Sequence, residues 1–186
     1  MRKGGFCLVA ASLLAATPAS ARVVIDGTPE FEAHVYACFE MITGVGGRPA
    51  EILDGLQISG NEHVIQENEG TGSTTYTNPA AATAPAFGGT GAGSGSTIDW
   101  DPDFPFVYAD GVERDFCAAL FHEMAHAIDG DRGTRPTGVD PASGVRRSEI
   151  GPNGATTLEN EYRDAKGLEQ RRLYGGNPLP PGSIIN

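Results

Sequence analysis

The chain has 186 residues, and its 13 lysines and arginines against 24 aspartates and glutamates give a formal net charge of −11. A protein this acidic is not expected to bind nucleic acid or an anionic membrane through its overall charge. A local basic patch is still compatible with the composition, because several arginines fall in the last quarter of the chain (Arg146, Arg147, Arg163, Arg171 and Arg172).

The N-terminus has the pattern of a secretory signal peptide over residues 1–21. Arg2 and Lys3 supply the positive start, residues 6–16 are apolar, and Ala19-Ser20-Ala21 is a small-x-small cleavage site. The alternative is an N-terminal membrane anchor, but the apolar stretch is too short to span a bilayer. Cleavage would leave residues 22–186 as one domain, which we expect to be secreted or periplasmic.

Two cysteines remain after the signal, Cys38 and Cys117. Because an exported protein meets an oxidising compartment, we predict a disulfide between them. By chain-entropy reasoning, a bridge across so long a loop contributes about 4 kcal/mol to stability. Two separate buried thiols are the alternative, since cysteine is among the most buried residue types.

The first elements after the signal are predicted to be a strand and a helix. Val23–Ile25 is a short β-branched run, which is typical of a strand. Pro29 can open a helix, since its missing N–H is not needed in the first turn. Apolar side chains then recur at helical spacing until Gly44 ends the pattern (Phe31, Val35, Phe39 and Ile42).

The middle of the chain gives weaker signals. Residues 52–64 alternate weakly and are expected to form one or two short strands. Residues 69–97 are rich in Gly, Ser, Thr and Ala, so we expect a flexible loop or a set of short edge hairpins. Ile98–Pro102 alternates and ends in proline, which predicts a strand at a sheet edge. His34 and His63 are interpreted as surface or hydrogen-bonded histidines rather than metal ligands.

A long helix is predicted over residues 112–129. Asp110 is a candidate N-cap, and Gly130 is a natural stop. The apolar residues form one buried stripe, and a different arc carries the pentapeptide His122-Glu123-Met124-Ala125-His126.

Beyond a loop rich in proline and glycine, a final helix is expected over residues 158–174. Thr156 or Thr157 can cap it, and it contains strong helix formers. Residues 175–186 hold three prolines and are expected to form a tail.

The pentapeptide has the pattern H-E-x-x-H. Residues four apart stand on one face of a helix, so His122 and His126 can converge on one metal ion. Glu123 points in a neighbouring direction, where it can reach a water molecule bound to that metal. Two histidines and a glutamate at this spacing indicate a zinc hydrolase with the glutamate as general base. The alternative is a chance occurrence of the pattern on an ordinary amphipathic helix.

A catalytic zinc needs three protein ligands and one open position. No histidine follows His126, so we expect a carboxylate as the third ligand. Glu159 is preferred, because the first turn of the final helix is a rigid support, and Glu149 in the preceding loop is the second choice. Further acids are less favoured (Glu161, Asp129, Asp131 and Asp140), and Asp129 suits a hydrogen bond to an imidazole N–H better than ligation.

Peptide hydrolysis also needs a donor for the developing oxyanion. Arg171 and Tyr174 place a guanidinium and a phenol close together, and either could point at the metal. We assign Tyr174 this catalytic role. The alternative is a basic turn that complements the helix dipole.

Five motifs in this order resemble the M91 metallopeptidase family, which is known from secreted bacterial effector proteases and toxin domains. They cover about the C-terminal half of the chain (Ile98–Pro102, His122–Ala127, Glu149–Gly151, Thr157–Asn160 with Arg163, and Gly167-Leu168 followed by Arg171 or Arg172 and Tyr174).

The resemblance implies a zincin-like fold and zinc-dependent endopeptidase activity. Glu159-Asn160 is similar to the Glu-Asn pair that supplies the third ligand in other glutamate zincins, which strengthens the preference for Glu159. One feature departs from the family. Effectors injected into host cells lack a cleavable export signal, so their intracellular targets are not carried over to this chain.

We therefore predict a single α+β zincin-like domain that acts as an exported zinc endopeptidase. His122, His126 and Glu159 would bind Zn²⁺, with Glu123 and Tyr174 as catalytic residues. The partner would be a peptide or protein substrate, and the protein is expected to be a monomer without nucleic-acid or membrane partners. The alternative function is a secreted interaction module that binds zinc without catalysis.

Overall fold

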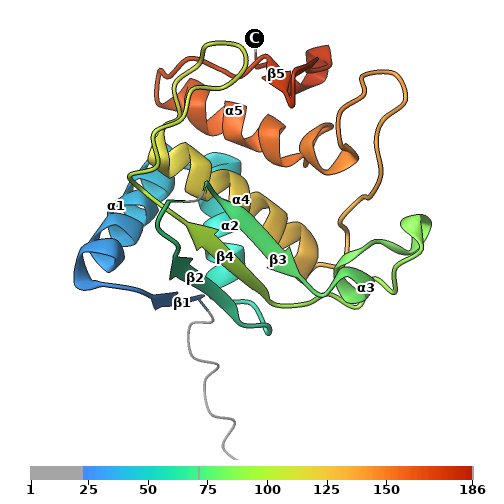
Figure 1. Ribbon diagram of the computed structural model, residues 1–186. Helices are drawn as coiled ribbons and strands as arrows, with labels where there is room; N and C mark the ends of the chain where they lie inside the picture. The colour runs from blue at the N-terminus through green and yellow to red at the C-terminus, as the bar shows by residue number, and fades with distance from the viewer. Residues whose placement is uncertain (1–22, 71, 186) are drawn as a thin grey trace, which may run out of the picture.

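A small sheet with helices packed on one of its faces forms the centre of the molecule (Figure 1). The computed structural model describes residues 23–70 and 72–185, so the expected signal peptide lies outside the described residues. The strand order in the sheet is β1-β2-β4-β3. The first three strands in that order run parallel, and β3 runs antiparallel to β4 (β1 Val23–Asp26, β2 His63–Glu67, β3 Thr74–Thr77, β4 Ser96–Trp100).

The two faces of the sheet differ in burial. Ile65, Ile98 and Trp100 are buried beneath the helices, and Trp100 contacts Phe31 with ring centroids 5.6 Å apart. The opposite face carries exposed side chains such as Tyr76. The expected strand at 98–102 was wrong in one respect, since β4 lies inside the sheet between β2 and β3. It can do so because Pro102 follows the strand and removes no donor from it.

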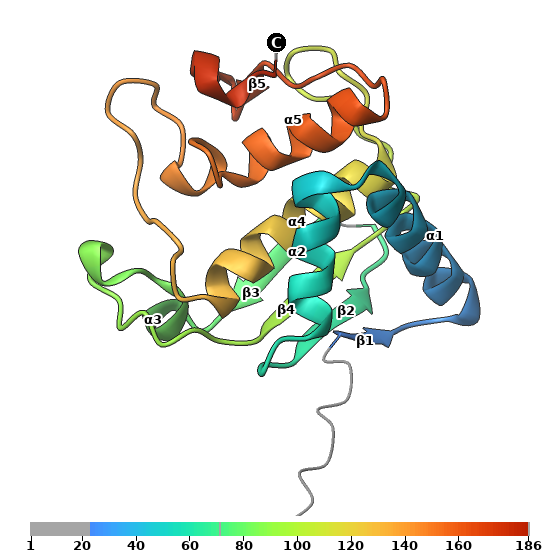
Figure 2. The same cartoon turned by 180° about the vertical axis from the view of Figure 1, so that it is seen from behind.

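Helices α1 (Pro29–Val45) and α2 (Gly47–Gln57) pack together beside the central helix, and α1 also contacts strand β1 (Figure 2). The predicted helix from Pro29 is confirmed, with Thr28 as its N-cap. The strands expected over residues 52–57 are wrong. Ile52, Leu53 and Leu56 are buried at helical spacing, so burying them on one helical face outweighed the weak alternation.

The central helix, α4 (Phe116–Asp131), carries the H-E-x-x-H pattern. Its N-cap is Asp115, whose carboxylate accepts a hydrogen bond of 2.7 Å from the backbone N–H of Ala118. The expected N-cap was wrong, because Asp110 accepts backbone hydrogen bonds from Arg172 and Leu173 instead.

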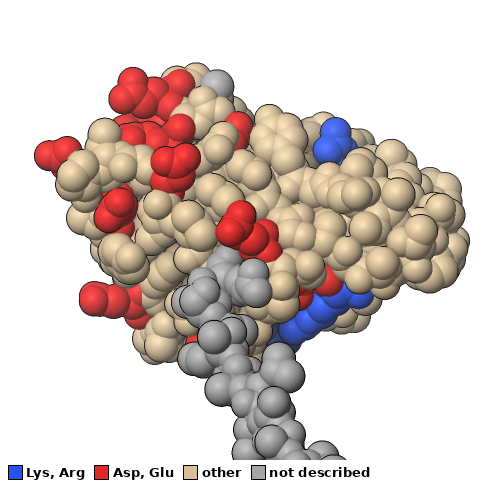
Figure 3. Space-filling view, turned by 90° about the horizontal axis from the view of Figure 1, so that it is seen from below, with Lys and Arg blue, Asp and Glu red and all other residues tan. Residues whose placement is uncertain are grey.

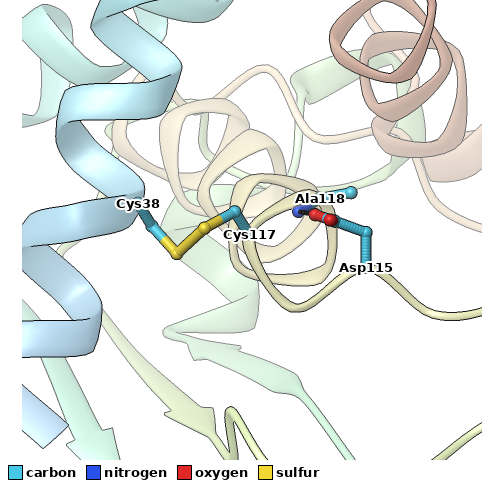
Figure 4. Close-up of a disulfide and its surroundings, with 4 residues drawn as sticks. All are labelled: Cys38, Asp115, Cys117 and Ala118. Carbon is cyan, nitrogen blue, oxygen red and sulfur yellow. Dashed lines mark hydrogen bonds between the residues drawn. A yellow bond between two sulfur atoms is a disulfide. The ribbon is translucent and has the colours of Figure 1, made fainter. Parts of the chain in front are cut away.

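A disulfide joins α4 to α1, as predicted from the sequence (Figure 4). Cys117 lies in the first turn of α4, next to the Asp115 cap, and Cys38 lies on the buried face of α1. The bridge therefore anchors the start of the helix that carries the two histidines.

Helix α5 (Ala155–Ala165) packs on the side of α4 away from the sheet (Figure 1). It ends much earlier than predicted, because Gly167 adopts a left-handed conformation with φ of 67°. A two-stranded hairpin and a short turn follow (β5 Leu173–Tyr174, β6 Asn177–Pro178, η3 Pro181–Ser183).

Residues 69–97, which we expected to be a flexible loop or short edge hairpins, contain several regular elements in their described part. They include strand β3, helix α3 (Pro79–Ala82) and a 3₁₀ turn (η1 Pro85–Phe87). No helix among the described residues combines the length and the apolar composition needed to cross a membrane. The predicted α+β class is confirmed, and the described elements form one domain.

Candidate metal and active site

The two histidines of the H-E-x-x-H pattern lie side by side on α4, one helical turn apart. The ring centroids of His122 and His126 are 4.9 Å apart, and the rings meet edge to face. Both side chains are almost fully buried. The helical spacing thus brings two imidazoles to one point, as the sequence predicted.

A carboxylate from outside the helix completes the cluster. Glu149 ends the 3₁₀ turn η2 (Arg147–Glu149) and lies opposite both rings. Its Oε2 lies 3.3 Å from Nε2 of His122, and its Oε1 lies 3.1 Å from Nε2 of His126. One ligand atom from each of the three residues lies within 4.8 Å of the others. The three residues could therefore hold one metal ion.

The turn that presents Glu149 is fixed by a close backbone approach. Gly154 precedes α5, and a Cβ atom there would lie 2.3 Å from the backbone nitrogen of Ile150. Only glycine leaves room for this contact. Thr156 Oγ1 also donates a hydrogen bond of 3.1 Å to Oε2 of Glu149. The start of α5 therefore sets the position of the carboxylate.

Glu159, our preferred third ligand, occupies a different place. Its Oε2 lies 3.1 Å from Nδ1 of His122, on the ring nitrogen that does not face Glu149. The geometry thus favours Glu149, the second choice, and gives Glu159 the position of an acceptor that orients His122. Glu161 is on another side of α5, where it pairs with Arg48.

Two arginines hold the Glu159 carboxylate in the interior. Arg163 donates to Oε1 over 2.8 Å, and Arg171 donates to Oε2 over 2.9 Å. Burial alone would raise the pKa of Glu159, but the hydrogen bond from His122 and the two guanidinium groups lower it to about 2. The carboxylate is therefore charged, and Nδ1 of His122 donates to it, so that Nε2 is the ring nitrogen that faces Glu149 and would bind a metal ion.

The charges around His122 favour a cation at the centre of the cluster. Burial alone would lower the pKa of His122, but Glu149, Glu159 and Glu123 together raise it to about 10. Burial alone would raise the pKa of the Glu149 carboxyl, but the contacts with His122 and His126 hold it well below its usual range. Two imidazole nitrogens and one carboxylate form a donor set that suits a divalent transition metal.

Glu123 lies beside this cluster and borders an open hollow. Thr75 on strand β3 donates a hydrogen bond of 2.8 Å to Oε2 of Glu123 and contacts its backbone carbonyl as well. The hollow has a volume of about 220 Å³, and both Glu123 and His122 line it. The carboxylate is therefore held in place and still accessible.

Tyr174 also lines the hollow, from strand β5. Its ring lies nearly parallel to that of His122, with centroids 6.4 Å apart. Burial and the neighbouring Glu149 raise the pKa of the Tyr174 phenol above its usual value. The group therefore stays protonated and able to donate a hydrogen bond.

The sequence pointed to most of these side chains but missed some of their partners. Thr75 lies in the glycine-rich stretch, where no sequence pattern distinguishes it. Its register opposite Ile98 in the sheet places it against helix α4. Asp129 does not make the expected hydrogen bond to His126, whose Nδ1 is buried without a hydrogen-bond partner in the described part of the chain. Asp129 accepts from Thr134 instead.

Together, the fold and the site define an α+β protein with a histidine–carboxylate cluster next to an accessible glutamate. The chain belongs to the M91 peptidase family, since the sequence profile of that family, described as an effector protein, matches residues 19–170. The resemblance noted in the sequence is thereby confirmed, and it makes the chain a member of a family of peptidases. Searches of curated proteins and of solved structures found no match.

Proposed function

We propose that this protein is an exported, zinc-dependent endopeptidase with a zincin-like domain. One observation carries the proposal: His122, His126 and Glu149 converge on one point, and His122 and the adjacent Glu123 line an open hollow. Three protein ligands beside an accessible position are typical of catalytic zinc sites, whereas structural sites are closed by four.

His122, His126 and Glu149 would hold the zinc ion through two Nε2 atoms and one carboxylate. When bound, zinc lowers the pKa of a coordinated water molecule to near neutrality and polarises a carbonyl group. Imidazole and carboxylate ligands also bind other divalent metals, so the choice of zinc rests on the ligand set and on the family resemblance.

The chain's own groups have separate tasks in this proposal. Glu123 takes a proton from the attacking water and returns it to the leaving amine. Thr75 keeps the Glu123 carboxylate in position through its hydrogen bond. Tyr174 donates to the oxyanion that develops on the scissile carbonyl, and Glu159 orients His122 through Nδ1.

The surroundings of the site suit an extended peptide. Gly72 and Ser73 line the hollow beside Glu123, and the next residues of the chain, Thr75 to Thr77 on β3, line a second hollow of about 370 Å³. The two hollows therefore follow one strand at the edge of the sheet. An edge strand offers backbone groups to a peptide, and openings on both sides favour cleavage within a chain.

Two observations support export. The Cys38–Cys117 disulfide requires an oxidising compartment to form and persist. The family match begins at residue 19, next to the expected signal cleavage after Ala21. We propose that the mature protein is secreted or periplasmic and acts as a monomer on peptide or protein substrates.

The alternative function is a secreted module that binds zinc but does not catalyse. Such a module would share the two histidines and Glu149. It would have no use for a glutamate that is held by Thr75 and accessible from a hollow. This arrangement favours the enzyme.

Replacing Glu123 with Gln tests the proposal. The purified wild type should contain about one zinc per chain and cleave peptides in a degenerate library read by mass spectrometry. Glu123→Gln should keep the zinc and lose at least about 10²-fold in kcat. Absence of zinc would refute the metal, and undiminished cleavage by Glu123→Gln would refute the role of the base.

A further inference from the structure

The two hollows along β3, here called the groove, are lined with arginines, although the protein as a whole is strongly acidic. On the face that Figure 3 shows, acidic side chains gather toward the α1 side, and few of them lie toward α3. Arg114 and Arg171 line the hollow beside Glu123, and Arg135 and Arg146 line the second hollow. Four arginines therefore line the two hollows in which a substrate would lie.

Arg114 forms no direct ion pair with a carboxylate in the part of the chain that the structure describes. Its guanidinium donates to the backbone carbonyls of Phe104 and Asp101, over 3.2 and 2.8 Å, and to Oγ of Ser73 over 3.0 Å. These acceptors are neutral, and no described carboxylate lies within 4.0 Å of it. Arg114 therefore brings into the hollow a positive charge that no described carboxylate contacts directly, although Asp101, Asp115 and Glu159 act on it from farther away.

The neighbouring charges do not cancel it. Glu159 is shared by two guanidinium groups, those of Arg163 and Arg171, so this buried group keeps a net positive charge. Glu123 and Glu149 are committed to the proton transfer and to the metal in the proposed mechanism. A desolvated guanidinium that faces an open hollow is stabilised by an incoming carboxylate, which it can bind through two N–H groups.

The second hollow is also lined by arginines that form no direct ion pair with a described carboxylate. Among the described residues, the Arg135 guanidinium donates only to the Thr77 hydroxyl, and neither Arg135 nor Arg146 forms an ion pair with a carboxylate. Ser148, next to the ligand Glu149, lines this same hollow. The unpaired arginines therefore flank the cluster on both sides.

We propose that the groove selects acidic peptides: Arg114 binds a substrate carboxylate next to the scissile bond, and Arg135 and Arg146 favour acidic residues on the opposite side. The proposal rests on the proposed peptidase function and adds a substrate class to it. The aromatic rings of Phe104, Phe106 and Tyr108 also line the first hollow and would give the ion pair a less polar surrounding than water.

The test begins with one cleaved sequence from the peptide library, acetylated and amidated at its ends. Each position near the cleaved bond is changed to Glu, Gln or Lys, and kcat/KM is measured. At one position next to the bond, we expect kcat/KM for the Glu peptide to exceed that for the Gln peptide by about tenfold. A hydrogen bond to a charged group contributes roughly the free energy that corresponds to this ratio. The same peptides with a free C-terminus show whether a terminal carboxylate serves instead.

Variants of the protein test whether Arg114 causes the preference for Glu over Gln. Arg114→Met should abolish the ratio of Glu to Gln, and Arg114→Glu should reverse it in favour of Lys. The double variant Arg135→Met/Arg146→Met should reduce the preference only on the opposite side of the bond. Arg132→Met removes one positive charge from an exposed position at the end of α4, outside both hollows, and should leave the ratios unchanged. Because Arg114 also holds the loop at Phe104, the ratio is the relevant measure, since misfolding would lower all rates together.

Binding supplies a readout that does not require turnover. The Glu123→Gln protein, with zinc and after removal of metal, is titrated with fluorescein-labelled Glu, Gln and Lys peptides, and anisotropy is recorded. Tighter binding of the Glu peptide that is lost in Glu123→Gln/Arg114→Met supports the proposal. Equal binding of the three peptides overturns it, even where the wild type cleaves them. If the wild type cleaves nothing, the peptidase function fails; the titration then uses Glu, Gln and Lys versions of one fixed library peptide and still decides the carboxylate preference.

Discussion

Nδ1 of His122 donates a hydrogen bond to Oε2 of Glu159 over 3.1 Å, which leaves the opposite ring nitrogen free to meet Glu149. Each of the two glutamates thus contacts a different nitrogen of the same imidazole ring. The one fixed by two arginines orients the ring, and the one from the η2 turn closes the cluster. Their different positions lead to different expected effects on metal binding.

Replacing Glu149 should cost more zinc affinity than replacing Glu159. Glu149→Gln removes a ligand, whereas Glu159→Gln removes an acceptor behind a ligand, for which a loss of about 10- to 100-fold is usual. Competition with a chromophoric chelator measures both affinities. A larger loss in Glu159→Gln than in Glu149→Gln would restore Glu159 as the third ligand. Glu161→Gln is the matched control on the same helix, away from the cluster.

Gly154→Ala should weaken zinc binding without touching a ligand. The added methyl would meet the backbone of Glu149 and Ile150 at 2.3 to 2.5 Å, so the η2 turn must shift. We expect a loss of about tenfold in zinc affinity, comparable to the loss of an outer contact of the site. Gly182→Ala is the control, because a Cβ there meets nothing within 4 Å. Unchanged affinity in Gly154→Ala would mean that the turn does not set the carboxylate position.

Tyr174→Phe should lower kcat and leave zinc content and KM nearly unchanged. The ring would still lie parallel to His122, and only the donor hydroxyl would be lost. Removal of one oxyanion donor costs about 10²- to 10³-fold in kcat. Steady-state kinetics with Tyr36→Phe as control, an exposed tyrosine on α1, would check this. If KM rises while kcat is kept, Tyr174 binds the ground state instead.

The double variant Cys38→Ala/Cys117→Ala should unfold at lower urea concentration than the wild type. The bridge closes a loop between residues separated by 79 positions, for which chain entropy gives about 4 kcal/mol. Both sulfurs are buried, so small cavities add to the loss. Equal urea midpoints for the two proteins would contradict this account. Zinc content of the folded variant is the control that the cluster itself survives.

The sequence predicted the parts of the site that depend on helical spacing. His122, Glu123 and His126 lie on α4 as expected, because four residues bring two side chains to the same face in any helix. The disulfide was predictable because only Cys38 and Cys117 remain after the expected signal.

The third ligand could not be fixed from the sequence. Glu149 and Glu159 are both downstream acids of suitable type, and their directions depend on contacts that the pattern does not contain. The close contact at Gly154 places the Glu149 carboxylate opposite the two histidines. Arg163 and Arg171 bind the Glu159 carboxylate and hold it on the other side of the His122 ring. The N-cap of α4 was also misplaced: Asp110 was predicted, but the helix begins at Phe116 after Asp115, and Asp110 accepts hydrogen bonds from Arg172 and Leu173.

The chain's last turn has a practical consequence for anyone who expresses the protein. The Asn160 side chain, adjacent to Glu159, donates to the backbone carbonyls of Arg171 and Ser183. Gln170 and Ile185 exchange a further pair of hydrogen bonds. A purification tag or a truncation at this end would therefore disturb the hydrogen bonds that hold α5, the helix that carries Glu159. The resulting loss of activity would resemble that of a variant in a metal ligand.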